Sequence, residues 1–251
     1  MKRVLIFGAT SAIAAEAAVI HARRGDRLHL VGRDPMKLAA VAARCAETGA
    51  TVTPTAADLD DLDANAALVD DAVAVLTGGE PLDAVLIAQG LLGDQLATER
   101  DYATAEAVLR TNLLGVVSLL VPLVNRLEAQ RHGRLGVITS VAGDRGRPRN
   151  YTYGAAKGAL GLYLQGVRTR VRPAGVSVTT LKLGPVDTPM TRDHTKHPLF
   201  GKPAAVAASI VAAMDARADE VYVPGFWRLI MPVVRNIPEA VIQRLGFLSG
   251  R

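Results

Sequence analysis

Near its start the chain reads Val4-Leu5-Ile6-Phe7-Gly8-Ala9-Thr10-Ser11-Ala12-Ile13-Ala14. Four apolar residues in front of a glycine indicate a short buried strand, and the alanine-rich continuation indicates a helix that follows at once. A tight turn between a strand and a helix offers free backbone N–H groups and the helix dipole to a phosphate. The stretch therefore predicts a strand–turn–helix unit that suits a dinucleotide pyrophosphate. The alternative is a plain strand-to-helix turn, because only Gly8 of the three expected glycines is present.

The rest of the chain alternates short apolar runs with longer helical stretches. The predicted strands cover residues 4–7, 28–31, 52–56, 84–88, 135–139, 176–183 and 220–223. The predicted helices cover residues 12–24, 36–48, 65–76, 102–130 and 153–171. Such alternation gives parallel βαβ units with right-handed crossovers. We therefore expect a single α/β domain over residues 1–251, a Rossmann-type doubly wound parallel sheet with helices on both faces, in which residues 190–251 form a substrate-side segment and C-terminal tail.

The composition fits this architecture and narrows the classes of function. Of the 251 residues, 49% are hydrophobic and 21% are charged, which supplies one large core and argues against disorder. The net charge of +5 comes without a basic run, so no nucleic-acid partner is expected. Cys45 is the only cysteine, which excludes an internal disulfide and a multi-cysteine metal site, and no metal is expected. No targeting or membrane-spanning segment is evident, so we expect a cytoplasmic protein.

Four polar residues stand at spacings that point to one catalytic site. Tyr153 and Lys157 lie four residues apart, so they share one face of a predicted helix. Ser140 follows the predicted strand at 135–139, and Asn112 lies in the long helix before that strand. Ligands of an open α/β sheet bind at the carboxyl ends of the strands, where Ser140 stands. The alternative is a pair on a helix surface and an unrelated serine at a strand end.

With several further segments, these residues make the sequence resemble the short-chain dehydrogenase/reductase family, in family order from residue 3 to about residue 190. The resemblance is carried by Gly8-Ala9-Thr10-Ser11-Ala12-Ile13-Ala14, Asp58-Leu59, Asn112, Ile138-Thr139-Ser140, Tyr153-Gly154-Ala155-Ala156-Lys157 and Leu183-Gly184-Pro185-Val186-Asp187-Thr188. Two positions depart from the family pattern. The usual Asn-Ala-Gly after the fourth strand is Ala88-Gln89-Gly90, and the usual Pro-Gly after the sixth strand is Leu183-Gly184.

The resemblance implies an NAD(P)-dependent oxidoreductase that reduces a carbonyl group to an alcohol, with a set role for each polar residue. Tyr153 would be the general acid, and the ammonium of Lys157 would lower the pKa of Tyr153 and hold the nicotinamide ribose. Ser140 would bind the substrate oxygen, and Asn112 would anchor a water of the proton relay. The alternative is a catalytically weak sensor or scaffold that binds the dinucleotide with the same fold.

The end of the second predicted strand bears on the choice of cofactor. An acidic residue at this point would accept the ribose hydroxyls and favour NAD(H), but the position is Gly32, and Arg33 follows. We expect Arg33 to bind a 2′-phosphate, so NADP(H) is preferred over NAD(H). The alternative is a solvated Arg33 with Asp34 on the ribose. The full set of cofactor contacts implied by the resemblance is Gly8, Thr10, Ser11, Ala12, Ile13, Arg33, Asp58, Leu59, Ala88, Gln89, Gly90, Tyr153, Lys157, Val186 and Thr188.

A narrower resemblance concerns the substrate. The sequence is similar to decaprenylphosphoryl-2-keto-β-D-erythro-pentose reductases in Gly90-Leu91-Leu92-Gly93-Asp94, in residues 142–149, in Gly161-Leu162-Tyr163-Leu164 and in two short segments of the tail. This similarity implies a phosphoryl-linked or lipid-linked keto-sugar. Arg145, Arg147 and Arg149 alternate in the loop between Ser140 and Tyr153, where guanidinium groups would suit a phosphate of the substrate. The alternative is a solvated loop.

The last 26 residues, 226–251, hold four arginines and one acidic residue, Glu239, among many apolar side chains. Such a segment suits an anionic membrane surface or a channel for a lipid tail, and equally packing on the body or in a subunit interface. Pro232 and Pro238 prevent one uninterrupted helix there. The family resemblance implies a homo-dimer or homo-tetramer, with the helices at 102–130 and 153–171 as candidate interfaces.

Overall fold

The computed structural model describes residues 1–192, 195–196 and 198–244. Its seven strands form one sheet in the order β3-β2-β1-β4-β5-β6-β7, and all neighbours are parallel. The strands are β1 (Arg3–Phe7), β2 (Arg27–Gly32), β3 (Val52–Ala56), β4 (Ala84–Ile87), β5 (Arg134–Ser140), β6 (Ser177–Leu183) and β7 (Glu220–Val223). The strand order reverses between β1 and β4, which is the topological switch point of a doubly wound sheet. The predicted fold class is confirmed.

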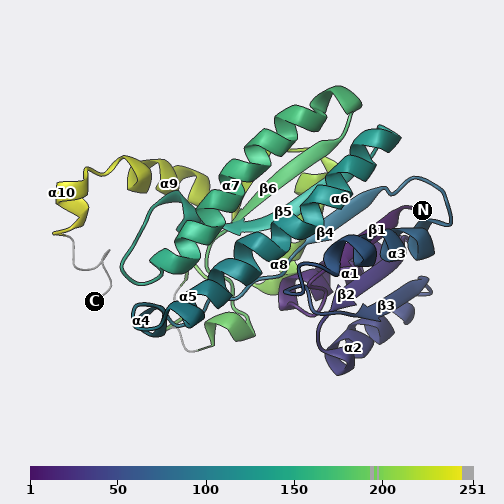
Figure 1. The fold of residues 1–251 in the computed structure, drawn as a ribbon, viewed down its shortest axis with the longest axis horizontal. Helices are drawn as coiled ribbons and strands as arrows, with labels where there is room; N and C mark the ends of the chain where they lie inside the picture. Colours follow the sequence, from purple (N-terminus) through teal and green to yellow (C-terminus); the bar gives the residue numbers. More distant parts are fainter. Residues whose placement is uncertain (193–194, 197, 245–251) are drawn as a thin grey trace.

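Helices cover both faces of the sheet (Figure 1). One face packs against α1 (Ala12–Arg23), α2 (Pro35–Ala46) and α8 (Pro203–Asp215). The other packs against α3 (Asn65–Thr77), α6 (Gly115–Gln130) and α7 (Tyr151–Val171). Strand β1 shows why both faces are apolar: Val4 and Ile6 point into the first core, and Leu5 and Phe7 into the second. Successive side chains of a strand point to opposite faces, so a strand between two helix layers is apolar throughout.

The predicted helix at 102–130 differs from the structure in one respect. It consists of α5 (Tyr102–Leu109), a single π-helical turn, η1 (Arg110–Leu114), and α6. By length and hydropathy alone, the run Tyr102–Gln130 would be long enough to cross a membrane. Its α6 part, however, buries a full stripe of side chains from Val116 to Leu127 in the second core. The run is therefore a core helix of the domain.

The C-terminal third contains three helices that were not assigned from the sequence. The first, α8, packs against α1 and belongs to the helix layer of the first core. The others are α9 (Trp227–Asn236) and α10 (Glu239–Ile242). Within its described part, residues 226–244, the tail has a helix break at residues 237–238, and α9 continues through Pro232. Arg251 and the rest of the tail from position 245 lie outside the described residues.

A short helix, α4 (Gln95–Thr98), precedes α5 and braces the start of α7. Its Gln95 accepts a hydrogen bond from the backbone N–H of Thr152, with 3.1 Å between the two atoms. The same side chain lies 3.4 Å from the Thr152 hydroxyl. The first turn of α7, which carries Tyr153, is thus attached to the segment that follows β4.

Candidate active site

The expected cofactor and catalytic residues gather at the carboxyl ends of β1, β4, β5 and β6. Gly8 follows β1, Ala88 follows β4, Ser140 ends β5, and Gly184 follows β6. These strands are consecutive neighbours in the sheet, so their ends lie along one edge (Figure 1). This edge at the switch point is where an open α/β sheet binds its ligands.

The turn after β1 fits a dinucleotide phosphate. Gly8 has a φ of 71°, and a Cβ at this position would lie 2.6 Å from the backbone nitrogen of Gln89. Only glycine therefore lets the turn approach the end of β4. Ser11 caps α1, since its hydroxyl accepts a hydrogen bond from the N–H of Ala14 at 3.1 Å. The N–H groups of Ala12 and Ile13, in the first turn of α1, have no intrahelical acceptor and can bind an anion.

At the end of β2, Arg33 and Asp34 have different surroundings. Arg33 is exposed, and no ion pair holds it within the part of the chain that the structure describes. The carboxylate of Asp34 caps α2 by accepting from the N–H groups of Met36 and Lys37 at 3.0 and 3.1 Å. Hydrogen bonds from Lys37 hold the pKa of Asp34 below its ordinary value. Asp34 is thus engaged by the helix, and Arg33 is available to a ligand.

The adenine side of the expected cofactor site contains an unusual buried amide. Leu59 is buried and Asp58 is exposed beyond the end of β3. The side chain of Gln89 is nearly buried, and neither its oxygen nor its nitrogen has a hydrogen-bond partner among the described residues. A Cβ at Gly115, the first residue of α6, would lie 3.1 Å from the Gln89 amide nitrogen and 2.9 Å from the carbonyl of Leu59. Gln89, where the family has a smaller residue, therefore fills the space between β4 and α6.

Asn112 lies on the π-helical turn and is fully buried. Its amide nitrogen donates to the carbonyls of Leu91 and Val108 at 2.6 and 2.8 Å, and its oxygen accepts from the N–H of Leu91 at 3.2 Å. π-Helical turns are rare and occur most often at functional sites. A Cβ at Gly90 would lie 3.1 Å from the Asn112 oxygen and 3.6 Å from the Lys157 nitrogen, so both groups border Gly90. The turn thus brings Asn112 to the loop after β4, next to Lys157.

Ser140 and Tyr153 lie near each other, since the Ser140 hydroxyl lowers the pKa of Tyr153. The Ser140 hydroxyl also accepts from the N–H of Ala142 at 3.1 Å and donates to the carbonyl of Leu183 at 3.3 Å. Lys157 is buried beside them, with its nitrogen 3.2 Å from the carbonyl of Ile138 and 5.8 Å from the centre of the Tyr153 ring. The structure therefore brings together the Ser, Tyr and Lys that the sequence placed in one site.

The pKa of Tyr153 differs from the expectation. Desolvation raises the pKa of Tyr153 to about 12, and the nearby Ser140 hydroxyl offsets only part of this increase. Burial also lowers the pKa of Lys157 to about 8. The expected lowering of the tyrosine pKa by Lys157 is not found: desolvation of the phenolate is the largest cause, and Lys157 is not among the causes of the shift. At neutral pH, Tyr153 holds its proton as an acid.

Glycines to which the sequence assigned no role set the distance between Ser140 and α7. The loop after Ser140 is a short 3₁₀ turn, η2 (Val141–Asp144). A Cβ at Gly143 would lie 2.6 Å from the nitrogen of Gly158, and a Cβ at Gly154 would lie 2.8 Å from the carbonyl of Ala142. The backbone of η2 thus rests directly on α7, one residue after Lys157. The signal in the sequence is the spacing of Gly154 and Gly158, which puts two glycines on one helix face.

The segment after β6 closes the site on its other side. Val186 is buried, and its carbonyl accepts a hydrogen bond from the Thr191 hydroxyl at 2.7 Å. The N–H of Thr188 donates to the same hydroxyl at 3.2 Å. Met190 lies 3.9 Å from where a Cβ at Gly90 would stand. Val186 and Thr188 are therefore held in a folded segment that reaches the loop after β4.

The three arginines of the loop at 145–149 do not converge. Arg145 bonds to the carboxylate of Glu239 at 2.5 Å and to the carbonyl of Arg235 at 3.4 Å, so it ties the loop to α9 and α10. Arg147 is half-buried, has no ion pair among the described residues, and has its pKa lowered by burial and by Arg149. An open pocket of about 640 Å³ lies between this loop, Tyr151 and Glu239. Arg147 is the arginine of the three that faces a cavity without a carboxylate of its own.

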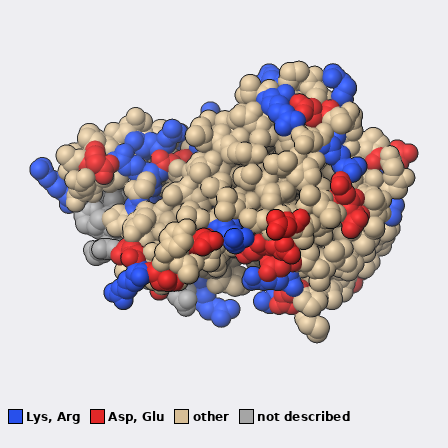
Figure 2. All heavy atoms as spheres, in the orientation of Figure 1, with Lys and Arg blue, Asp and Glu red and all other residues tan. Residues whose placement is uncertain are grey.

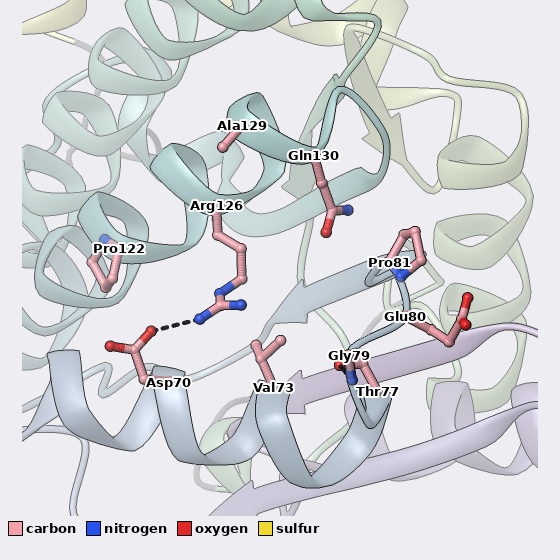
Figure 3. Close-up of a pocket in the computed structure, with 10 residues that line it drawn as sticks. All are labelled: Asp70, Val73, Thr77, Gly79, Glu80, Pro81, Pro122, Arg126, Ala129 and Gln130. Carbon is pink, nitrogen blue, oxygen red and sulfur yellow. Dashed lines mark hydrogen bonds and ion pairs between the residues drawn. The ribbon is translucent and has the colours of Figure 1, made fainter.

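A second pocket lies away from these residues, between α3 and α6 (Figure 3). Its rim includes Gly79, Glu80 and Pro81, which precede β4, so it stands toward the amino end of that strand. Arg126 bonds to Asp70 across it at 2.9 Å. The pocket is therefore separate from the catalytic edge of the sheet.

The sequence matches known proteins over nearly its whole length. Residues 2–199 match the family described as short chain dehydrogenase. An uncharacterized oxidoreductase of Mycobacterium tuberculosis is 35% identical over 243 residues, which is 96% of each chain. An uncharacterized oxidoreductase of Streptomyces coelicolor is 33% identical over 245 residues, which is 97% of this chain and 96% of the other.

The fold of this chain is also similar to the folds of solved structures. The crystal structure of levodione reductase matches with a TM-score of 0.81 at 25% identity, over 90% of this chain and 97% of that chain. A variant of actinorhodin polyketide ketoreductase, crystallised with NADPH, matches with a TM-score of 0.79 at 21% identity, over 94% and 98% of the two chains. At this identity the second likeness concerns the fold alone.

Proposed function

Because the chain belongs to the short-chain dehydrogenase family, it is an NAD(P)-dependent oxidoreductase, and we propose that it uses NADP(H) to reduce a carbonyl group of its substrate to an alcohol. The observation that carries this proposal is the gathering of Ser140, Tyr153 and Lys157 at the end of β5, where Ser140 acts on the pKa of Tyr153 and the Lys157 nitrogen lies 5.8 Å from the centre of the Tyr153 ring. A bound nicotinamide cofactor supplies the hydride. The residues of the chain bind the oxygen and provide the proton.

Each side chain has a defined task in this reaction. The Tyr153 hydroxyl gives its proton to the carbonyl oxygen as that oxygen gains negative charge. Its raised pKa of about 12 keeps the proton in place until then. The Ser140 hydroxyl binds the same oxygen and stabilises the charge that develops on it. Lys157, as an ammonium ion, stabilises the phenolate that remains and binds the cofactor ribose, and Asn112 anchors a water that returns the proton.

The surroundings of Arg33 and Asp34 support the preference for NADP(H). Asp34, the residue that would accept the ribose hydroxyls of NAD(H), already accepts two backbone hydrogen bonds as the cap of α2. Arg33 is exposed beside it, and a guanidinium can bind a 2′-phosphate through two hydrogen bonds. The remaining cofactor contacts are those expected from the sequence, from the Gly8 turn to Thr188.

For the substrate we propose a keto-sugar that carries a phosphoryl or lipid-linked phosphoryl group. The support is the narrower sequence similarity together with Arg147, which borders an open pocket without an ion-pair partner in the described part of the chain. Arg149 is exposed on the same loop, whereas Arg145 is occupied by Glu239. The test compares kcat/KM for a polyprenyl-phosphoryl keto-pentose with kcat/KM for simple cyclic ketones. Equal or higher values for the simple ketones contradict this substrate class.

The helix α9 supports peripheral contact with a membrane from the cytoplasmic side. Its Met231 is buried, but Leu229 and Val233 are 78% and 66% exposed, one turn apart on the same side of the helix. Exposed apolar residues next to Arg228 and Arg235 suit the surface of an anionic bilayer. Flotation with anionic and zwitterionic vesicles tests this. Binding to anionic vesicles that Leu229→Glu abolishes is expected, and equal flotation of the variant contradicts the proposal.

The exposed faces of α5, α6 and α7 support a homo-dimer or homo-tetramer. In Figure 2 the surface over these helices is largely free of charged side chains. Large apolar side chains are exposed there, including Tyr102, Val121 and Leu162. On the same face, basic and acidic side chains are interspersed around the rim, which does not suit a nucleic-acid backbone (Figure 2). The presence of Asn112, Ser140, Tyr153 and Lys157 argues against the catalytically weak sensor or scaffold.

A further inference from the structure

A cluster of charged residues lies beside the catalytic serine and takes no part in the proposed reaction. Lys182 on β6 bonds to the carboxylates of Asp144 and Glu220, at 2.7 and 3.0 Å. The Tyr222 hydroxyl donates to the second oxygen of Asp144 at 2.7 Å. The Lys182 nitrogen also lies 5.3 Å from the centre of the Tyr222 ring. Both oxygens of Asp144 are therefore bound by groups from the last two strands of the sheet.

The cluster is buried, so its parts depend on one another. The side chains of Asp144 and Lys182 are only 5% and 10% exposed. Burial disfavours the charge of Lys182, but the hydrogen bonds that Lys182 donates to Asp144 and Glu220 outweigh this effect and raise its pKa. Removal of one partner of a buried pair leaves an uncompensated charge, which is far more disruptive than the loss of a surface pair. Asp144 is thus held in place as long as Lys182 is intact.

The charged cluster lies next to the loop that follows Ser140, so it can fix the position of that loop. Asp144 ends the turn η2, which begins directly after Ser140. Ser140 contacts the carbonyl of Leu183, and Asp144 contacts the side chain of Lys182, so both ends of the loop are bound to consecutive residues of β6. Between these ends, Gly143 rests on Gly158 of α7. The loop is therefore fixed against the strand on one side and against the helix of Tyr153 on the other.

We propose that Asp144 is a positioning residue, and that its pairing with Lys182 and Tyr222 holds the Ser140 hydroxyl beside Tyr153, where it binds the substrate oxygen. Asp144 touches neither substrate nor cofactor in this proposal, which rests on the proposed role of Ser140 in carbonyl reduction. Misplacement of a catalytic group by about 1 Å can lower a rate on the order of a hundredfold. The expected consequence is a loss in kcat rather than in cofactor binding, because the turn at Gly8 and Arg33 lies on other strands.

The experiment measures kcat, the KM for NADPH and the unfolding of purified variants. Lys182→Met should lower kcat by roughly 10- to 100-fold, as expected for a displaced catalytic group, and leave the KM for NADPH within about twofold. Lys182→Arg keeps the charge and should retain most of the activity, and Tyr222→Phe should have a smaller effect than Lys182→Met. The control is Lys2→Met, which breaks a bond to Asp215 of 2.6 Å at the opposite edge of the sheet. It should not change kcat.

A double-mutant cycle separates positioning of Ser140 from a general loss of stability. In a Ser140→Ala background, Lys182→Met should lower the residual kcat by less than about twofold, because residues that act through one another are not additive. A full additional loss in this background contradicts the proposal. So does a folded Lys182→Met variant with a wild-type kcat.

Hydrogen exchange gives a measure that does not depend on turnover. In the full-length protein saturated with NADPH, Lys182→Met should speed the exchange of the backbone amides of residues 141–145 at least tenfold, while Lys2→Met leaves them unchanged. Unchanged exchange in Lys182→Met overturns the positioning role, whatever the activity. If wild-type protein reduces no carbonyl and exchange still accelerates as expected, the proposed reaction fails and the contact between Asp144 and the serine loop stands.

Discussion

In the catalytic site, desolvation shifts the pKa values of Tyr153 and Lys157 in opposite directions. The phenol keeps its proton, because burial raises its pKa to about 12, and the ammonium is made easier to deprotonate, because burial lowers its pKa to about 8. The sequence identified both residues and Ser140 from their spacing. It could not predict the direction of the tyrosine shift, because desolvation depends on what packs around the ring rather than on the Tyr-x-x-x-Lys motif.

From the lowered pKa of Lys157 we predict how the free energy of unfolding depends on pH. Between about pH 8 and 10, the unfolded chain keeps the proton on this lysine and the folded protein releases it, so the free energy of unfolding rises with pH. Lys157→Met should remove this rise, and it should make the protein more stable at pH 7 because no charge is buried. Urea unfolding at a series of pH values measures both effects. Lys202→Met, at an exposed lysine, should keep the wild-type slope. An unchanged slope in Lys157→Met would show that the lysine is not desolvated.

Arg33 is the residue on which the cofactor preference depends. Arg33→Ala should raise the KM for NADPH by about 10- to 100-fold, in line with about 1.5–3 kcal/mol for hydrogen bonds to a charged group. The KM for NADH should change little, because NADH has no 2′-phosphate. Steady-state kinetics with both cofactors checks this. The exposed Arg23, at the end of α1, offers a control in Arg23→Ala. Equal losses with NADPH and NADH would contradict a 2′-phosphate contact.

At the scale of elements, the site depends on two features that periodicity does not reveal. The π-helical turn adds one residue to a turn of an apolar helix, which leaves the pattern of residues 102–130 almost unchanged but brings Asn112 to the loop after β4. In the contact of η2 with α7, the two backbones touch directly at glycines. The sequence shows where these glycines are, but it does not show which backbone segment each of them contacts. The seven strands and the long helices up to α7, in contrast, were predicted within a few residues, because β-branched runs and alanine-rich helices alternate clearly.

Gly158 tests the contact between η2 and α7. A Cβ at this position would lie 2.8 Å from the carbonyl of Gly143, so Gly158→Ala must push the serine loop away from Lys157 and Tyr153. We expect a loss of about 1–3 kcal/mol in the free energy of unfolding, as for other overpacked sites, together with a lower kcat. The matched control is Gly166→Ala on the same helix, where a Cβ meets open space. It should stabilise the protein by up to about 1 kcal/mol through helix propensity. Equal behaviour of the two variants in chemical unfolding would contradict the contact.

At the scale of the whole molecule, strand order follows from chain alternation, since right-handed crossovers leave few ways to arrange seven parallel strands. The C-terminal third was less predictable. Its helices α9 and α10 pack on the body through single contacts such as Met231 and the pair of Arg145 with Glu239. Such long-range contacts leave no periodic signal, so the sequence left four alternatives open for this segment: a membrane surface, a channel for a lipid tail, packing on the body and a subunit interface.

We predict that the subunits of the oligomer contact one another through the exposed surface of α6 and α7. Leu162 is 70% exposed on α7, and Tyr102 and Val121 are exposed on α5 and α6. Apolar side chains that gather on one surface mark an interaction site. Leu162→Glu should convert the dimer or tetramer to monomers at micromolar concentration, because it buries a charge in the interface. Sedimentation equilibrium measures this, with Leu229→Glu on α9 as the control for a charge on another surface. A monomeric wild-type protein, or an unchanged assembly in Leu162→Glu, would rule out this interface.

The proposed carbonyl reduction depends most directly on the proton that Tyr153 donates. Tyr153→Phe removes only the hydroxyl and leaves the ring in place. We measure kcat for NADPH oxidation with a keto substrate, and the NADPH affinity by fluorescence of the bound cofactor. The account predicts that kcat falls by about 10²- to 10⁴-fold, the usual contribution of a general acid, while NADPH affinity stays within about twofold. A variant that keeps wild-type turnover would contradict the account.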